Sequence, residues 1–161
     1  MKCIASCLVL LLIVSYTVAA APDTPASHFD QLKKLAGTWE GKTADGKPVS
    51  IALRVVSDGS ALMELDPVEN MVTMFHPDND RLLMTHYCSA HNQPRMQAEV
   101  SPDGKRFAFT FLDATNLARP GAGHMHRMVL TIEDANHMTE QWFFLDDSKE
   151  LTETFKLARK Q

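Results

Sequence analysis

Residues 29–41 read FDQLKKLAGTWEG, and the spacing of the apolar side chains changes within this stretch. Before Gly37, apolar side chains recur at the interval expected on one face of an amphipathic helix: Phe29, Leu32, Leu35 and Ala36. Ser27 is a suitable N-cap for that helix, and Gly37 is a suitable end. From Trp39 onward, apolar residues alternate with polar ones, as in a half-buried strand. The stretch therefore predicts one short helix that leads into the first strand of a β-rich fold.

The rest of the chain repeats this alternation between turn signals such as Asp45-Gly46 and Asp103-Gly104. After the strand that contains Trp39, we expect strands over residues 49–55, 61–65, 71–75, 81–88, 94–100, 105–112, 124–133, 137–145 and 151–159. About ten strands with short connections predict an all-β, antiparallel, up-and-down barrel, because closure removes the exposed edges. The alternative is a β-sandwich, which needs longer connections, and only residues 113–123 offer one.

The N-terminal residues predict export from the cytoplasm. Lys2 is followed by an uncharged apolar run and by the small residues Val18-Ala19-Ala20, which is the layout of a cleavable signal peptide over residues 1–20. Residues 21–26 are expected to form a flexible leader, and residues 27–161 a single domain. We therefore expect a secreted or periplasmic protein without a stable membrane span after cleavage.

Charge and cysteine content narrow the class of protein further. Loss of Lys2 leaves 15 lysines and arginines against 20 acidic residues, a net charge of −5. An acidic chain without clustered cations excludes nucleic acid as the expected partner. Cleavage also removes two of the three cysteines, so Cys88 has no partner for an intramolecular disulfide and is expected to be a buried, unreactive thiol.

The stretch from Phe29 to Gly41 resembles the opening of lipocalin-like (calycin-type) barrels, in which a short helix precedes a Gly-x-Trp at the start of the first strand. The resemblance implies that Trp39 fills one end of the barrel and that a basic residue near the C-terminus, preferably Arg159, covers its ring. Residues 85–96 and 124–127 resemble an uncharacterised group of small exported bacterial proteins. These resemblances imply a fold and no activity.

A candidate metal site follows from His124 and His126. Side chains two apart on a strand share a face, and Met128 would continue that face. Two imidazoles on one strand are a recurrent metal-ligand pair, and His86 is the candidate third ligand. The alternative is that the imidazoles only donate and accept hydrogen bonds at the rim of the barrel.

A candidate ligand site combines those residues with polar side chains near the middle of the chain. His86, Asn92 and Arg95 are expected near the mouth of the barrel, where Asn92 and Arg95 could hold a ligand carboxylate. The predicted ligand-binding set is therefore His86, Asn92, Arg95, His124, His126 and Met128. Methionine-rich apolar faces favour a mostly apolar small molecule as the partner.

The leading hypothesis is thus an exported small-molecule-binding protein. The alternatives are a metal-binding protein or metal-dependent enzyme built on His124 and His126, and a structural barrel filled with side chains. No phosphate-binding loop or nucleophile motif is present, so we assign no catalytic residue and expect a binding protein rather than an enzyme. The sequence assigns no cofactor and no oligomeric state.

Overall fold

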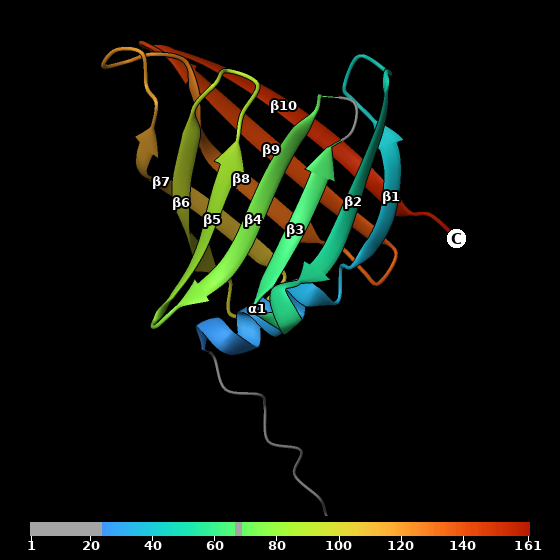
Figure 1. The fold of residues 1–161 in the computed structure, drawn as a ribbon. Coiled ribbons are helices and arrows are strands. Elements are labelled where there is room, and N and C mark those ends of the chain that lie inside the picture. Colours follow the sequence, from blue (N-terminus) through green and yellow to red (C-terminus); the bar gives the residue numbers. More distant parts are fainter. Residues whose placement is uncertain (1–23, 67–68) are drawn as a thin grey trace, which may run out of the picture.

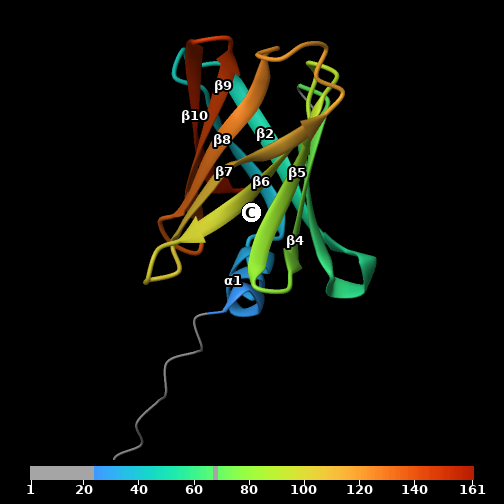
Figure 2. The same cartoon turned by 90° about the vertical axis from the view of Figure 1, so that its left-hand side faces the viewer.

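The computed structural model describes residues 24–66 and 69–161. In that part of the chain, ten antiparallel strands pair in chain order, and the first strand pairs with the last to close a barrel (Figures 1 and 2). The strands are β1 (Gly37–Lys42), β2 (Pro48–Val56), β3 (Ala61–Asp66), β4 (Met71–Asp78), β5 (Arg81–Tyr87), β6 (Gln93–Val100), β7 (Arg106–Thr115), β8 (His124–Ile132), β9 (His137–Asp146) and β10 (Lys149–Arg159). The predicted up-and-down barrel is confirmed, and the β-sandwich alternative is wrong because β1 and β10 pair through hydrogen bonds.

A short helix, α1 (Pro25–Lys33), lies across one end of the barrel and packs against β4 and β5 (Figure 1). Its N-cap is Thr24 rather than Ser27: the Ser27 backbone N–H donates to the Thr24 hydroxyl at 3.2 Å. Pro25 occupies the first helical position, where its fixed φ and missing N–H are tolerated. The helix therefore begins inside the segment that was expected to be a flexible leader.

Trp39 fills the barrel at the α1 end. Its side chain is fully buried, and its indole N–H donates to the Leu35 carbonyl at 2.8 Å. Trp39 is paired across β1 and β10 with Arg159, whose guanidinium lies 4.3 Å from the indole ring. Arg159 also donates to the carbonyls of Ala36 and Lys34 at 2.7 and 3.0 Å. This is the arrangement that the resemblance implies, and it ties the helix to both terminal strands.

Two glycines permit this close packing. Gly37 has a φ of +142°, which an L side chain rarely adopts, and a Cβ there would lie 2.7 Å from a guanidinium nitrogen of Arg159. A Cβ on Gly41 would lie 2.0 Å from the Lys156 carbonyl oxygen on β10. Gly37 thus leaves room for the Arg159 side chain, and Gly41 leaves room for the Lys156 backbone, where β1 pairs with β10.

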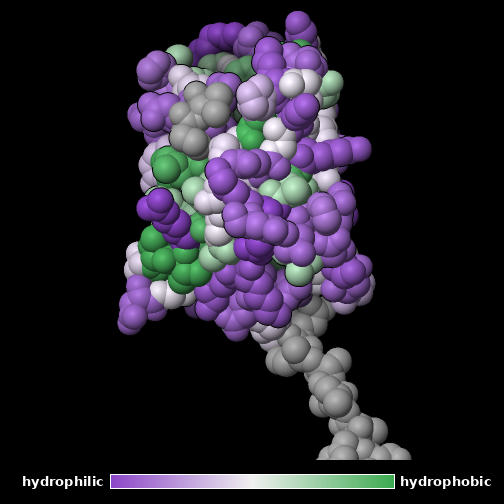
Figure 3. Space-filling view, turned by 90° about the vertical axis from the view of Figure 1, so that its right-hand side faces the viewer, coloured by the Kyte–Doolittle hydropathy of each residue, from purple (hydrophilic) through white to green (hydrophobic). Residues whose placement is uncertain are grey.

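The interior next to α1 is densely filled with apolar side chains. The methionines contribute strongly: Met84, Met96, Met128 and Met138 are each at most 1% exposed, among Phe75, Phe107 and Phe109. The outer surface shown in Figure 3 is mostly hydrophilic, as expected for alternating strands. Among the described residues, no helix is long and apolar enough to cross a membrane.

The hairpins that begin after β1, β3, β5, β7 and β9 all lie at the end opposite α1 (Figure 1). This end has no covering helix among the described residues. The two ends of the barrel therefore differ, and the differences bear on function.

Candidate functional site

A cavity of about 350 Å³ lies at the end opposite α1. Its wall includes Trp142 and Phe144 from β9 and Phe155 from β10. Met71 and Met125 add flexible apolar surface. This part of the wall suits an apolar group of a small ligand.

Two glutamates form the most unusual part of the wall. Glu64 on β3 is 4% exposed, and Glu140 on β9 is 1% exposed. Strand alternation puts them inside: Glu64 is two residues from buried Leu62, and Glu140 stands between buried Met138 and Trp142. Ionised carboxyl groups at such depth are costly unless they are neutralised, paired or hydrogen-bonded.

The carboxyl groups of Glu64 and Glu140 lie close enough that the charge of Glu140 raises the pKa of Glu64. The Trp142 indole N–H donates to Glu140 Oε2 at 3.1 Å. Glu64 Oε2 and Glu140 Oε1 are buried and have no hydrogen-bond partner among the described residues.

Burial and mutual repulsion set the charge of this pair. Burial raises the pKa of Glu64 well above its ordinary value, and the negative charges of Glu140 and Asp66 raise it further. Burial also raises the pKa of Glu140 to about 7, although the hydrogen bond from Trp142 opposes that shift. Near neutral pH Glu140 is therefore partly ionised, and its negative charge grows as the pH rises above 7.

His86, a predicted ligand-binding residue, lies on the same cavity wall. Its Nδ1 is 2.9 Å from the Thr73 hydroxyl, and its ring lies 4.7 Å from the Trp142 ring. Burial lowers the pKa of His86 to about 4, so the imidazole is neutral at neutral pH. Its Nε2 is buried and without a hydrogen-bond partner among the described residues.

His124 and His126 do not join His86. The pairing of β8 with β9 is irregular between Met125 and Arg127, which breaks the alternation assumed for His124, His126 and Met128. As a result, Met125 lines the cavity and Met128 is fully buried in the core. The rings of His124 and His126 still lie near one another, with their centroids 6.5 Å apart, whereas Met128 packs in the apolar core.

Each of the two histidines has its own local partner. The His124 Nδ1–H donates to the Ala122 carbonyl at 2.7 Å, and its ring packs on Phe111 at 4.7 Å. The His126 Nε2 lies 2.7 Å from a carboxylate oxygen of Glu150 on β10. Within residues 24–66 and 69–161, no group of three or more His, Cys, Asp or Glu side chains is placed to hold a metal ion.

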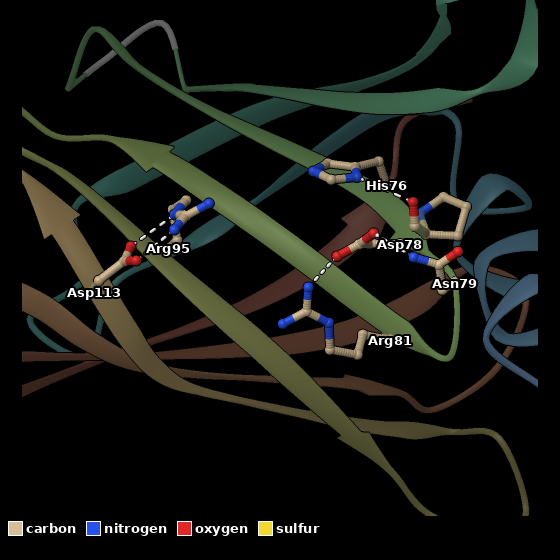
Figure 4. Close-up of polar contacts among 7 residues, drawn as sticks. His76, Asp78, Asn79, Arg81, Arg95 and Asp113 are labelled. Atoms are coloured by element: carbon tan, nitrogen blue, oxygen red, sulfur yellow. Dashed lines mark hydrogen bonds and ion pairs between the residues drawn. The ribbon is translucent and has the colours of Figure 1, made fainter.

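Arg95 and Asn92 also lie away from the cavity wall. Arg95 is exposed, and its guanidinium pairs with the Asp113 carboxylate through Nε at 2.6 Å and through a second contact from Nη2 (Figure 4). Asn92 is buried and donates to the Gly123 carbonyl at 2.8 Å, which links two hairpins at this end of the barrel. Neither residue is placed to hold a ligand carboxylate in the cavity.

Cys88 is half-buried on the cavity wall, less deeply buried than expected. Burial raises the pKa of its thiol, which disfavours the reactive thiolate. The described structure therefore gives no support to a nucleophilic role.

Glu64, Glu140 and Trp142 were not predicted as site residues from the sequence, although a signal was present. Each stands at an inward position of an alternating strand, where an apolar residue is expected. A glutamate at such a position is the informative exception.

No protein-family model matches the chain, and no curated protein matches its sequence. The fold and the site define the class of protein instead. It is a closed up-and-down β-barrel that is filled with side chains at its helix end and contains a cavity at the other end. A pair of carboxyl groups, a neutral histidine and aromatic rings line that cavity.

Proposed function

We propose that this protein is a lipocalin-like binding protein that holds a small organic molecule in the cavity. The observation that carries the proposal is the set of buried polar atoms on the cavity wall that have no hydrogen-bond partner among the described residues: Glu64 Oε2, Glu140 Oε1 and His86 Nε2. Each such atom costs the folded state about 1–3 kcal/mol. A ligand that bonded to them would remove that cost.

The rest of the wall supports a mostly apolar ligand with one polar end. Trp142, Phe144 and Phe155 offer broad aromatic surface, and the cavity volume lies within the usual range for small-molecule sites. The metal-dependent alternative has no comparable support, because His86, His124 and His126 are not brought together. A barrel filled with side chains is likewise disfavoured by the cavity itself.

A neutral, apolar fluorescent probe, N-phenyl-1-naphthylamine, tests this proposal with purified protein. We expect saturable binding by the wild type and loss of binding in Met125→Trp, which places a larger side chain on the cavity wall. Met63→Trp is the matched control, because Met63 alternates with Leu62 and Glu64 and faces outward. Absence of binding by the wild type, together with no co-purified organic molecule in native mass spectrometry, would leave the filled structural barrel as the better description.

We also propose that the protein acts outside the cytoplasm, as the signal-peptide pattern indicates. Residues 1–23, which contain the predicted cleavage site, lie outside the described residues. N-terminal sequencing of the exported fraction should give a start at or within a few residues of Ala21. An exported protein that retains Met1 would contradict this proposal.

A further inference from the structure

We infer that the ligand is an organic cation, a small amine whose ammonium group binds beside Glu64 and Glu140 and whose apolar body packs on Trp142. The inference rests on the proposed function, since it names the class of molecule that the same cavity takes. Geometry, charge and aromatic surface support it separately.

The charge of the cavity wall is strongly one-sided. Five carboxyl side chains line the cavity: Glu64, Asp66, Glu69, Glu140 and Glu153. No lysine or arginine is among the described residues of this wall. Lys47, which interacts electrostatically with Glu153, is itself paired with Asp45 at 2.9 Å. An anionic ligand such as a fatty acid would be repelled, whereas a cation would be attracted.

The deepest acceptors suit an ammonium group. Glu64 Oε2 and Glu140 Oε1 are buried oxygens that lack a hydrogen-bond donor in the described structure. His86 Nε2 can act as a third acceptor when its Nδ1–H donates to Thr73. A primary ammonium carries three N–H donors, and charge-assisted hydrogen bonds to carboxylates are the stronger kind. Ionised Glu140 supplies a negative charge to pair with the positive charge of such a ligand.

The aromatic wall favours an organic cation over a metal ion. Indole is the best of the aromatic side chains at attracting a cation to its face, and Trp142 is held beside Glu140 by its own hydrogen bond. Phe144 and Phe155 would cover the apolar part of the ligand. Calcium, in contrast, requires about six to eight oxygen ligands. Within the described part of the chain, no group of three or more metal-ligating side chains is placed for it.

The pair also links binding to pH. Because the pKa of Glu140 is about 7, acidification below neutral pH protonates it and removes the negative charge that attracts the amine. The other ionisable groups on this wall are Glu64 and Asp66 from β3, Glu69 before β4, His86 from β5, Cys88 after β5 and Glu153 from β10, with ion-paired Lys47 beside Glu153. Affinity for the amine is therefore expected to rise between about pH 6 and about pH 8.

Three probes of equal carbon number separate charge from apolar contact: phenylbutylamine, phenylbutanol and phenylbutyrate. Each competes with N-phenyl-1-naphthylamine for the purified protein near pH 8. We expect the amine to bind roughly tenfold more tightly than the alcohol, the difference between a charge-assisted and a neutral hydrogen bond. The carboxylate is expected to bind more weakly than the alcohol.

The double variant Glu64→Gln/Glu140→Gln, which removes every charge that the pair can carry, should reduce the preference for amine over alcohol to less than about twofold while alcohol binding persists. Glu99→Gln, which changes an exposed glutamate on β6, is the matched control and should preserve the preference. Persistent alcohol binding shows that these variants remain folded.

The outcomes distinguish the two proposals. If the wild type binds all three probes equally, the cavity binds small molecules but the cation assignment is overturned. If the preference for the amine survives the double glutamine variant, or is the same at about pH 6 and about pH 8, the glutamate pair is not its source and the inference is likewise overturned. If no probe binds, the proposed function itself fails.

Discussion

Replacing Glu140 by glutamine should change how folding stability depends on pH. Glutamine keeps the shape of the side chain but cannot ionise. In the unfolded chain Glu140 has a pKa near 4.5, whereas burial raises it to about 7 in the folded protein. The folded protein therefore holds this proton more tightly, so its stability falls as pH rises from 4.5 through 7.

The size of the effect follows from that difference. One pKa unit corresponds to about 1.4 kcal/mol, so a shift from 4.5 to about 7 lowers the stability of the wild type by roughly 3 kcal/mol once Glu140 is ionised. About 2–3 kcal/mol of that change falls between pH 5 and pH 8. Glu140→Gln removes the pH dependence of stability that comes from Glu140 and leaves the pH dependence that comes from Glu64.

Urea denaturation at about pH 5 and about pH 8 measures the effect. The quantity to measure is the free energy of unfolding of Glu140→Gln minus that of the wild type. We expect this difference to increase by roughly 2–3 kcal/mol from about pH 5 to about pH 8. Glu99→Gln, at an exposed position on β6, should show no such change. A relative stability of Glu140→Gln that stays constant within about 0.5 kcal/mol would refute the reasoning, because it would mean that Glu140 ionises in the folded protein as easily as in water.

Trp39→Ala should lower the free energy of unfolding by about 3–5 kcal/mol, since it empties the helix end of the barrel, and an unchanged urea midpoint would show that Trp39 packs differently. Arg159→Ala should cost about 1–3 kcal/mol through three lost hydrogen bonds to carbonyls and the lost contact with the indole, measured the same way; a wild-type midpoint would exclude this. Gly41→Ala should destabilise by at least about 1–3 kcal/mol, because its Cβ would meet the Lys156 carbonyl, and retention of the wild-type stability would contradict that contact. Cys88 should react with Ellman's reagent more slowly than free cysteine, because burial raises the pKa of the thiol, and more slowly still with phenylbutylamine bound; labelling as fast as free cysteine would refute its placement in the cavity.

The strand pattern could be predicted because its information is local. Alternation and turn residues such as Asp45-Gly46 locate all ten strands to within a few residues. Closure through β1 and β10 is not local, and it followed from a physical argument about edges together with the stretch that contains Trp39. The start of α1 was misplaced by a few residues because Thr24 and Ser27 are both good N-caps, and Pro25 favours the earlier one.

The site was harder to predict because it depends on register and on distant partners. β8 is irregular between Met125 and Arg127. There the His126 ring contacts the Glu150 carboxylate, and Met125 rather than a histidine lines the cavity. Nothing in the local pattern of a histidine-rich strand start signals such an extra residue. Arg95 is paired with Asp113, eighteen positions away, so its availability could not be judged from its neighbours in the sequence.

The contrast between the two ends of the barrel is itself an argument for binding. At the helix end, the buried indole N–H of Trp39 and the guanidinium of Arg159 have hydrogen-bond partners. At the open end, Glu64 and Glu140 each have a buried oxygen without a hydrogen-bond partner in the described part of the chain, at positions where strand alternation would accept an apolar side chain. Removing buried ionisable groups in favour of apolar ones is often neutral or stabilising. A contribution to folding stability therefore does not explain why glutamates occupy these positions. A ligand with hydrogen-bond donors would explain their burial, their unpaired oxygens and their position beside Trp142.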